Sequence, residues 1–453
     1  MNRLFTHRRK RMYTYQDFIE ARSKQDFVHQ AIQQHKTTEL YQIAVIADEY
    51  DRQQNRTIMN YRKLLYTITG KAVTDSYSAN YKMPSGYFNR FVTQQNQYLL
   101  GNGITWNNED TANKLGDDFD RQIQKAGKEA LVGGVSFGFF NYDHLEVFSV
   151  REFVPLYDEE NGALMAGIRF WQVDLQKPLR ATLYELDGYT DYIWIDGKGK
   201  ELAPKKAYIE KSVSTEADGV TIYAGENYPT FPIVPLWGNP HHQSEIIGIR
   251  EEIDAYDLIK SGFANDIDDA SQIYWTLENA GGMDDIDLVQ FLERMKTVKA
   301  AVVDDNAKAE AHTLDVPYNA REAILERLEK DLYKDYMALD TERLASGAVT
   351  ATQIRAAYEP LDNKSKQYEY CVEEFIQGIL AIKGIEDKPT FSRARLVNMT
   401  EEINTVLSAA EYLDAEYVTE KILTLMGDGN QTETVLARMR EEDFDRFNGG
   451  ESE

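Results

Sequence analysis

The chain has 453 residues, of which 42% are hydrophobic and 11% aromatic, and its formal net charge is −25. That length allows two or more cores at ~100–200 residues per domain, and the composition excludes a disordered chain. Acids outnumber bases by 75 to 50, which disfavours stable binding of duplex DNA over the whole surface, because such binding neutralises phosphates with Lys and Arg. The one cysteine, Cys371, excludes an internal disulfide framework and fits a reducing compartment.

The exception to the acidic balance is the basic segment Met1–Arg11, which contains no acid. We interpret it as a flexible, solvated end, with contact to nucleic acid or to an acidic partner as the alternative. Helical patterns broken by polar clusters then predict helices over Tyr15–Glu20, Ala31–Asp51 and Asn55–Thr67. No stretch approaches the ~18 uninterrupted apolar residues of a membrane-spanning helix, so we expect no membrane partner.

Residues 81–130 remain mainly helical, with an interruption at Gly101–Gly103, and residues 131–237 change to strand patterns. These are short β-rich runs bounded by Asn, Asp, Gly or Pro: Val135–Tyr142, Glu146–Val150, Ala166–Val173, Ala181–Glu185, Tyr189–Ile195 and Lys206–Ile209. Together they predict one α+β domain that contains hairpins. Its acids and aromatic residues are scattered at strand spacing and form no catalytic set.

A long acidic helix follows the strand Pro232–Trp237. One face repeats apolar residues at three- and four-residue intervals: Ile246, Ile249, Ile253, Tyr256, Ile259 and Phe263. Ser244 stands at the N-cap position, and at ~1.5 Å per residue the helix would be roughly 45 Å long. The other face carries Glu245, Glu251, Glu252, Asp254, Asp257, Asp266, Asp268 and Asp269, against only Arg250 and Lys260. We interpret that face as a solvated acidic surface that repels phosphate, and expect the apolar face to need neighbours.

A small insert separates this helix from a second one. It reads as strand Ile273–Glu278, helix Asp284–Lys296 and strands Lys299–Val303 and Ala309–Val316. Pro317 opens the second helix, Asn319 to about Leu339. Two helices that leave a body and return, with a compact module at their tip, form a stalk and a head.

The remaining chain begins with Thr341–Thr352, which is rich in small residues and has a break signal at Ser346-Gly347. A third long helix, Gln353 to about Lys383, carries Pro360 near its start, where the missing N–H predicts a kink. Thr390–Val397 reads as a basic strand. Residues 401–453 read as acidic helices.

Motifs for catalysis or metal binding are missing from the sequence. There is no GxxxxGK[ST] loop, and no Ser/His/Asp or Cys/His set has a supporting motif. His241-His242 lack a HExxH frame, and Asp266 and Asp268 point to different sides of a helix. We therefore expect no catalytic residue, no cofactor and no metal.

Several segments, in the same order along the chain, resemble the portal proteins of tailed bacteriophages, in particular the siphovirus type. They are Tyr87–Trp106 with its YLLG ending, Ala126–Tyr142, Phe153–Trp171, the strand Pro232–Trp237 leading into Ile253–Tyr256 (IDAY) and Asn265–Asp269, and Ser346–Ile382. The resemblance covers roughly residues 80 to 400. It implies an α+β, portal-like fold with a mixed α/β wing, a two-helix stem, a small β-α-β-β clip, a long kinked spine helix and a helical C-terminal crown.

The resemblance also implies a division of the chain. Residues 1–30 would be a flexible basic N-terminus, 31–243 the first part of the wing, 244–272 the stem helix, 273–317 the clip, 318–340 the second stem helix, 341–352 the tunnel loop, 353–400 the long helix and the return strand of the wing, and 401–453 the crown. No Walker loop is present, so the ATP that drives packaging would be hydrolysed by a partner.

The function that the resemblance implies is that of a head-to-tail connector, a ring of twelve copies at one capsid vertex through which DNA is packaged and ejected. Its partners would be terminase, a head-completion adaptor, the major capsid and scaffolding proteins, and double-stranded DNA that passes through without tight binding. Its location would be the virion, and the host cytoplasm during assembly. A phage-encoded nucleic-acid-processing enzyme and a monomeric virion adaptor remain as alternatives.

Three sets of residues are site candidates. The tunnel-loop candidates, expected to form the constriction around DNA, are Arg343, Ser346, Gly347, Val349 and Thr350. The channel-facing stem candidates are Glu322, Glu326, Lys330 and Lys334, an i,i+4 stripe for which ordinary pairing on an exposed face is the alternative. The clip candidates for docking terminase are Asp284, Asp285, Asp287 and Glu293.

Overall fold

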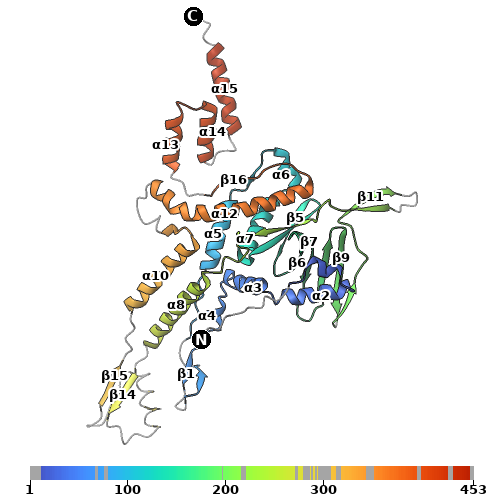
Figure 1. Ribbon diagram of the computed structural model, residues 1–453. Coiled ribbons are helices and arrows are strands. Elements are labelled where there is room, and N and C mark those ends of the chain that lie inside the picture. The colour runs from blue at the N-terminus through green and yellow to red at the C-terminus, as the bar shows by residue number, and fades with distance from the viewer. Residues whose placement is uncertain are drawn as a thin grey trace.

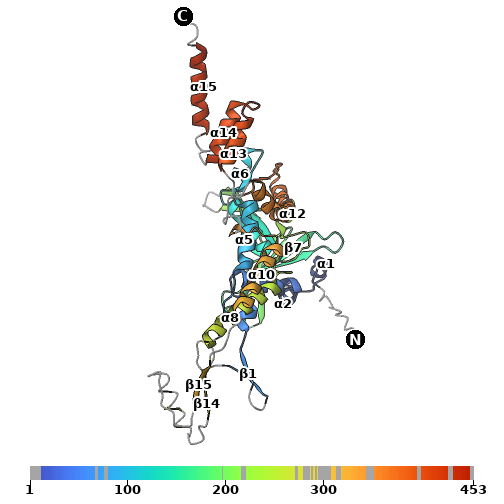
Figure 2. The same ribbon diagram turned by 90° about the vertical axis from the view of Figure 1, so that its left-hand side faces the viewer.

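The structure is a computed structural model that describes residues 12–66, 70–75, 80–195, 197–215, 221–270, 274–278, 286, 289, 290, 293, 308–312, 318–342, 351–394, 399–426 and 432–448. The described chain is elongated (Figure 1). A body of sheets and helices occupies the middle, a pair of helices projects from it at one end, and three helices stand at the other. The view at 90° shows the same axis and a much thinner profile (Figure 2).

The body contains a five-stranded antiparallel sheet in the order β10-β9-β8-β7-β6. Its strands are β6 (Phe153–Tyr157), β7 (Leu164–Trp171), β8 (Leu179–Glu185), β9 (Gly188–Ile195) and β10 (Lys198–Glu201). The helices α1 (Tyr15–Ile19) and α2 (Lys24–His35) cover one face, where Phe27 and Ile32 pack with Ile168 and Leu183. Alternate residues of the strands therefore form a core on this side.

The other face of that sheet packs against a three-stranded sheet in the order β13-β4-β5. This sheet comprises β4 (Val135–Asn141), β5 (His144–Ser149) and β13 (Ile233–Trp237). Aromatic rings fill the space between the two sheets, with the Phe137 and Phe153 centroids 4.4 Å apart and Phe148 and Phe153 5.8 Å apart. Gly167 on β7 is required here, because a Cβ on it would lie 2.0 Å from the Phe153 ring.

Helices cover the far side of the three-stranded sheet. They are α3 (Glu39–Asp51), α5 (Tyr87–Leu100), α7 (Phe119–Gly133) and α12 (Ala351–Lys383). The spine helix α12 lies directly on the sheet, since a Cβ on Gly138 would be 2.4 Å from the Phe375 ring. Pro360 lies inside α12, as expected. Six of the seven residues of β4 are buried, because the strand has packed layers on both faces.

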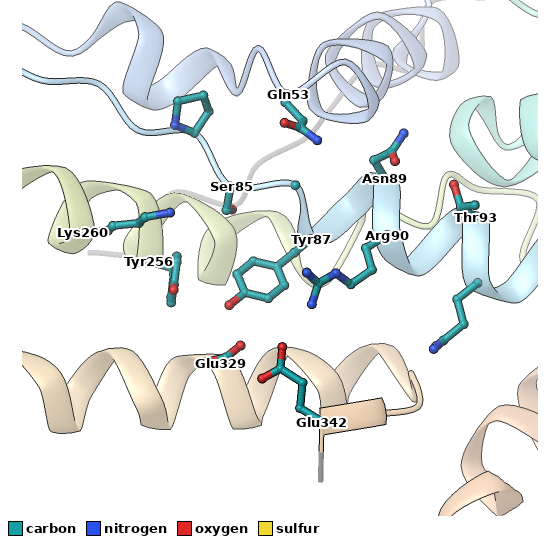
Figure 3. A pocket seen from close by; sticks show the side chains of 13 residues that line it. Gln53, Ser85, Tyr87, Asn89, Arg90, Thr93, Tyr256, Lys260, Glu329 and Glu342 are labelled. Carbon is teal, nitrogen blue, oxygen red and sulfur yellow. The ribbon is translucent and has the colours of Figure 1, made fainter. Parts of the chain in front are cut away.

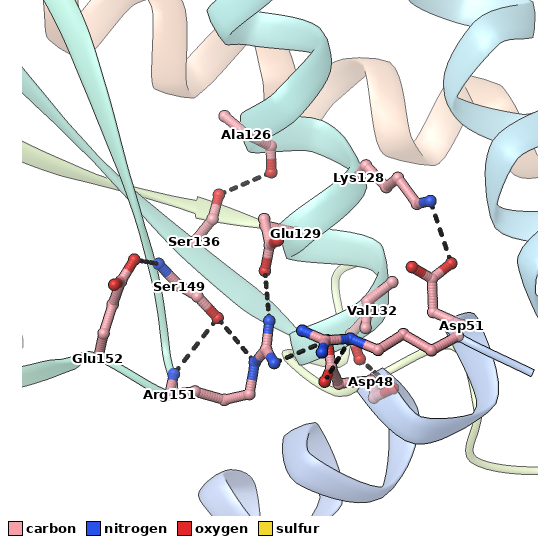
Figure 4. Close-up of polar contacts among 12 residues, drawn as sticks. Asp48, Asp51, Ala126, Lys128, Glu129, Val132, Ser136, Ser149, Arg151 and Glu152 are labelled. Carbon is pink, nitrogen blue, oxygen red and sulfur yellow. Dashed lines mark hydrogen bonds and ion pairs between the residues drawn. The ribbon is translucent and has the colours of Figure 1, made fainter. Parts of the chain in front are cut away.

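Polar contacts join α3, α7 and β5 at the edge of this layer (Figure 4). The guanidinium of Arg151 lies 2.7 Å from an Asp48 carboxylate oxygen and 3.4 Å from a Glu129 oxygen, and it donates to Ser149 Oγ at 3.2 Å. Lys128 is paired with Asp51 at 3.1 Å. These contacts fix how the two helices sit on the sheet.

Further helices and hairpins lie outside these layers. The helices are α4 (Arg56–Asn60), α6 (Glu109–Leu115), α13 (Met399–Ala409), α14 (Ala415–Met426) and α15 (Thr432–Asn448). The hairpins are β1 (Leu64–Tyr66) with β2 (Ala72–Thr74), and β11 (Ile209–Thr215) with β12 (Thr221–Glu226), and both project from the body. The last three helices stand apart from the body at the C-terminal end (Figure 1).

Most predicted elements are present, but several boundaries were wrong. The helix predicted over Ala31–Asp51 is two helices, because Thr38 Oγ1 accepts from Tyr41 N–H and starts α3. The helix predicted over Asn55–Thr67 ends at Asn60 and gives way to the β1–β2 hairpin, in which Gly70 adopts φ +77°.

Two strand predictions also differ from the structure. Instead of a strand at Lys206–Ile209, Lys206 forms only an isolated bridge with Tyr189, and β11 begins at Ile209. The strand predicted over Thr390–Val397 is β16 (Thr390–Phe391), which pairs with β3 (Ile104–Thr105) rather than with a large sheet. Residues 395–398 lie outside the described residues.

Candidate functional site

The projecting pair of helices is the stem, formed by α8 (Arg250–Ala270) and α10 (Tyr318–Tyr336). Both views show the two helices side by side. Phe263 and Tyr318 meet edge to face at 5.0 Å, and Arg321 forms an ion pair with Asp266. Beyond them, β14 (Tyr274–Glu278) pairs antiparallel with β15 (Lys308–His312), so the chain leaves and returns through adjacent strands.

The predicted start of the first stem helix at Ser244 was wrong, because α8 begins at Arg250. Ser244 Oγ donates to the Val132 carbonyl at 2.6 Å and accepts from Ile246 N–H, which fixes this segment to the end of α7. Gly248 adopts φ +98°, a conformation that interrupts a helix. Ile246 and Ile249 are buried in the body core, so the segment before α8 anchors the stem.

The interpretation of the acidic face of α8 as a solvated surface was wrong for Asp254 and Asp257. Asp257 is fully buried, where it accepts from Asn55 Nδ2 and from Ser85 N–H at 2.8 Å. Burial raises the pKa of Asp257 above its usual value. Asp254 accepts from the Tyr50 hydroxyl and from Thr57 Oγ1 at 2.7 Å. These carboxylates attach α8 to α3 and α4 rather than facing solvent.

Further along α8, polar side chains bind the segment that precedes α5. Ser261 Oγ accepts from Met83 N–H at 3.0 Å, and Asn265 Oδ1 accepts from Tyr81 N–H at 2.6 Å. With Asp257 on Ser85, polar side chains spaced three to four residues apart hold one extended segment along the helix. Backbone donors of this segment are thus satisfied by side chains of α8.

Between the stem helices, Glu252 of α8 faces Asp331 and Asp335 of α10. Burial, a hydrogen bond with Asp335 and the negative charges of both aspartates raise the pKa of Glu252 to about 7. A carboxyl group that holds its proton can donate to a neighbouring carboxylate, whereas two ionised carboxylates repel. A proton on Glu252 therefore favours the contact between the two helices at this point.

At the base of the stem, Lys364 of α12 joins three elements. Its Nζ lies 2.6 Å from a Glu245 carboxylate oxygen, donates to the Tyr336 carbonyl at 3.0 Å, and stands 3.5 Å from the centroid of the Tyr336 ring. The Tyr336 hydroxyl in turn donates to Gln95 at 2.8 Å. Burial lowers the pKa of Lys364. This cluster ties the spine helix to the entry of α8 and the end of α10.

A cavity of about 690 Å³ lies beside this base, between the N-terminus of α5 and the two stem helices (Figure 3). Arg90 and Tyr87 point into it from α5, while Glu329 and Glu342 face them from the α10 side. The Arg90 guanidinium donates to the Tyr333 hydroxyl at 2.7 Å. Opposite charges line this cavity, which suits polar contacts.

The predicted site residues are only partly within the described chain. Glu322, Glu326, Lys330 and Lys334 all lie on α10 and are exposed, and Lys330 is paired with Glu326 at 3.5 Å. Glu293 is exposed and helical. Outside the described residues lie Arg343, Ser346, Gly347, Val349, Thr350, Asp284, Asp285 and Asp287.

Other expectations concern metals and membranes. No group of three or more His, Cys, Asp or Glu side chains within the described ranges could hold a metal ion. His242 stacks on Trp237 with ring centroids 3.8 Å apart, which gives it a packing role. Of the helices whose residues are described, none has the length and apolar character needed to cross a membrane.

The sequence did not reveal the polar residues that attach the stem helices to the body. Lys364, Asn55 and Arg90 stand in polar stretches typical of exposed helix faces and helix ends. A periodic pattern assigns such residues to solvent, since it cannot show which distant segment covers them. The only local signal is the run of carboxylates on α8, which would need partners if that face were covered.

Comparisons with known proteins agree with this architecture. The family model for phage portal proteins of the SPP1 Gp6-like type matches residues 29–443. The portal protein of Clostridium phage phiCD119 is 25% identical over 323 residues, which are 65% of this chain and 69% of that protein. The portal protein of Bacillus phage SPP1 is 23% identical over 329 residues, 68% of this chain and 63% of that protein.

Among solved structures, a chain of the neck of an empty GTA particle, computed with C6 symmetry, aligns with a TM-score of 0.43 and 9% identity. The alignment covers 75% of this chain and 90% of that one. The family model extends from α2 into α15 and so includes the body, the stem and the C-terminal helices. The chain belongs to the SPP1 Gp6-like family of phage portal proteins.

Proposed function

We propose that twelve copies of this chain close into a ring whose stem helices surround a channel for double-stranded DNA. Family membership makes it a ring-forming component of the phage head–tail junction. The observation that carries the finer proposal is the stem itself, two helices that leave the body with a thin apolar seam and exposed outer flanks. Identical subunits placed head to tail close into a ring when the rotation per contact divides the circle.

The charge of the stem suits a conduit. Each phosphate that a protein neutralises adds affinity, and affinity for passing DNA acts as friction. We propose that Glu322, Glu326, Lys330 and Lys334 face the channel, where paired charges weaken both attraction and repulsion. The Glu326–Lys330 pair on the exposed face of α10 supports this, because the cation is already neutralised by its neighbour.

The partners follow from position along the axis. We propose that residues 273–317 form the clip, which docks terminase during packaging and the head-completion adaptor afterwards, through Asp284, Asp285, Asp287 and Glu293. The strand pair β14–β15 at the far end of the stem supports a compact module there. The C-terminal helices at the opposite end would form a crown (401–453) inside the capsid, with the major capsid and scaffolding proteins around the body.

The loop between α10 and α12 would supply the narrowest point of the channel. We propose that Arg343, Ser346, Gly347, Val349 and Thr350 form a constriction, because a loop of small residues allows a tight backbone. In support, Leu339, which precedes the loop, packs with Tyr358 and Leu361 of α12. The wing would comprise residues 31–243 and 353–400, the stem 244–272 and 318–340, and the loop 341–352, after a basic N-terminus (1–30).

The portal family is structural rather than catalytic. We propose accordingly that this chain catalyses no reaction and holds no cofactor, that a partner hydrolyses the ATP, and that assembly takes place in the host cytoplasm. A nuclease and ATPase assay on the purified protein tests the alternative of a nucleic-acid-processing enzyme. Turnover that persists through purification and is lost with a single carboxylate substitution would favour that alternative.

The ring is tested by native mass spectrometry and electron microscopy of the purified chain. Twelve copies of a 52.0 kDa chain give 624 kDa, with a central channel in end-on views. A folded species that stays monomeric at micromolar concentration would contradict the ring and favour the adaptor. A closed ring of another subunit number would correct the number alone.

The clip and the loop have separate tests. Asp284→Lys with Asp285→Lys should leave rings intact and weaken terminase binding, whereas loss of binding only after deletion of residues 401–453 would contradict the clip assignment. Gly347→Pro fixes φ and removes a backbone donor. Rings of normal size that package DNA slowly or fail to retain it would support the constriction, and normal packaging would contradict it.

A further inference from the structure

The five-stranded sheet extends beyond the layer that covers one of its faces. Near the middle of β7, Gly167 lies against Phe153, in the core that the two sheets share. Side chains two residues apart on a strand share a face, so Arg169 and Trp171 lie on the same side as Gly167. The Arg169 guanidinium stands 5.5 Å from the centroid of the Trp171 ring, and Trp171 is 37% exposed. This end of the face is therefore open to solvent.

The strand register aligns four residues in one row across this open end. From β7 to β10, each paired directly with the next, they are Trp171, Arg180, Ile193 and Lys200. Residues that pair directly across strands point to the same face. Ile195 follows Ile193 by two residues and shares that face, where it is 55% exposed and paired with Lys198. Apolar and cationic side chains thus lie beside one another on this face.

The loop that joins β7 to β8 adds two apolar side chains at the same end of the sheet. Val173 is 85% exposed and Leu175 is 95% exposed. Internal hydrogen bonds order this loop, since Gln172 Nε2 donates to the Lys177 carbonyl at 2.8 Å and Asp174 Oδ1 accepts from the N–H two residues later. Exposed apolar surface of this kind is typical of interaction sites. We name as the outer patch the apolar residues Trp171, Val173, Leu175 and Ile195 with the cations Arg180, Lys198 and Lys200.

The cations of the outer patch have no acidic partner within the described ranges. Arg180, Lys198 and Lys200 are exposed, and no ion pair engages any of them there. Close by in the chain, by contrast, Lys205 lies 2.9 Å from a Glu185 carboxylate oxygen. The outer patch is therefore a local excess of positive charge on a chain whose net charge is −25.

Acidic residues that are near in sequence do not remove this excess. Glu201 pairs with Tyr192, which lies in the core beneath α2, so Glu201 points to the opposite face of the sheet. Asp174 accepts a hydrogen bond within its own loop. Asp196, between β9 and β10, lies outside the described residues. Even with both aspartates counted, cations are in the majority on this surface.

This combination of side chains restricts the class of partner. A phosphate backbone would pair with the cations but would leave Val173 and Leu175 without apolar contact, and the acidic chain as a whole repels it. An acidic protein segment that carries apolar side chains provides both kinds of contact. Figure 1 shows the five-stranded sheet on the right of the body and the stem on the lower left. In the proposed ring, this sheet lies away from the channel and towards the shell.

We propose that the outer patch binds an acidic segment of the surrounding major capsid protein, with apolar side chains between its carboxylates. This rests on the proposed function, which puts the ring at a capsid vertex. Apolar side chains of the segment would cover Val173 and Leu175, and its carboxylates would pair with Arg180 and Lys200. Elsewhere the acidic surface of the ring repels such a segment, so charge directs it to the outer patch.

A peptide test measures the chemistry of the outer patch without a capsid. A short labelled peptide that alternates Glu and Leu should bind the purified protein, by fluorescence anisotropy, at least tenfold more tightly than a Lys–Leu or a Glu–Ser peptide. Arg180→Glu with Lys200→Glu should reverse the order of the Glu–Leu and Lys–Leu peptides. The matched control is Lys114→Glu with Lys125→Glu, exposed lysines of α6 and α7, which should bind as the wild type does.

Two results of that test would overturn the inference. One is a Glu–Leu peptide that binds no more tightly than the Lys–Leu peptide, or equally well in the Arg180→Glu, Lys200→Glu variant. The other is a labelled DNA duplex that binds more tightly than any peptide and is lost in the same variant, which would assign the outer patch to nucleic acid.

A second test uses the assembled shell, by co-expression with the major capsid and scaffolding proteins of the same phage. Rings of the Arg180→Glu, Lys200→Glu variant should have the normal native mass, but the fraction of shells that contain a ring should fall at least tenfold. The Lys114→Glu, Lys125→Glu control should match the wild type. A photocrosslinking amino acid in place of Leu175 should link the ring to the major capsid protein.

Variant rings that enter shells at the wild-type frequency would overturn the inference and leave the proposed ring standing. A crosslink from Leu175 to the scaffolding protein alone would overturn the choice of partner. A wild-type protein that never forms rings would instead overturn the proposed function, whereas the peptide result does not depend on ring formation.

Discussion

In the body, aromatic rings fill the space between two sheets, whereas in the stem two helices meet along a thin seam and are attached by buried polar contacts. Phe137, Phe148 and Phe153 are each almost completely buried. Along the stem, Ile324 of α10 and Ile267 of α8 remain exposed. The core of the body is therefore apolar, with its ion pairs at the edge, while the stem depends on Asp257, Glu252 and Lys364.

The difference indicates which part of the molecule can change its position. Dispersion and hydrophobic burial are lost gradually with movement, but a buried carboxylate or ammonium without its partner is strongly unfavourable. The stem is thus held in one arrangement by a few specific contacts. If they are removed one at a time, the stem should loosen while the body keeps its stability.

The largest expected effect is in the body. Phe153→Ala removes a ring at the centre of the inter-sheet core and should lower the free energy of unfolding by about 3–5 kcal/mol. Ile324→Ala on the stem, an exposed position, should change it by no more than ~0.5 kcal/mol in the dissociated chain. Denaturant unfolding of both variants measures the difference. Similar losses would show that the stem has an apolar core of its own.

Removal of the Lys364 ammonium comes next. Lys364→Met leaves the Glu245 carboxylate buried without a cation, with only the Asn239 amide still donating to it, and should cost about 3 kcal/mol. Lys364→Met with Glu245→Gln should recover most of that loss, because no uncompensated charge remains. Lys366→Met, an exposed lysine on the same helix, is the control. Equal stabilities for the single and double variants would contradict a charge-based role for this pair.

A smaller effect is expected from the polar side chains of α8 that bind the segment before α5, namely Asp257, Ser261 and Asn265. Asp257→Ala leaves Ser85 N–H without its acceptor and removes one of the two acceptors of Asn55 Nδ2, at a cost of about 2 kcal/mol. Hydrogen exchange should rise in α4 and in residues 80–85, and the five-stranded sheet should be unaffected. Glu251→Ala, at an exposed position of the same helix, should leave exchange unchanged. Faster hydrogen exchange throughout the body would show that these hydrogen bonds stabilise the whole fold.

The smallest effect is a dependence on pH between the stem helices. The folded-state pKa of Glu252 is raised from 4.5 to about 7, so the folded chain binds more protons than the unfolded chain between those values. Stability is therefore present at pH 4.5 and lost as the pH rises towards 7, by roughly 1 kcal/mol after allowance for solvent screening. Hydrogen exchange of α8 and α10 at pH 5 and pH 7.5 measures it. Glu252→Gln should abolish this dependence, and a variant that keeps it would assign the effect to another group.

The amino-acid sequence by itself determined the order of the elements and the family. The strand runs from Val135 to Ile195, the second stem helix and the long helix with Pro360 were predicted within a few residues, because period-2 and period-3.6 patterns are local. The first stem helix was predicted as well, but with a start six residues too early. Turn and cap chemistry explains part of what was missed. Thr38, Gly70 and Gly248 interrupt patterns that read as continuous helix, and their effect depends on the backbone conformation around them.

Only the tertiary structure decided which side of each helix is covered. Asp254 and Asp257 fit an exposed acidic face by sequence, yet α3, α4 and the segment before α5 pack on that face and bring Tyr50, Asn55 and Ser85 to them. Lys364 likewise becomes a buried cation only because α10 ends against α12. The residue type decides whether a side chain can carry a charge. The free energy of that charge in the folded protein depends on how much solvent distant segments exclude from it.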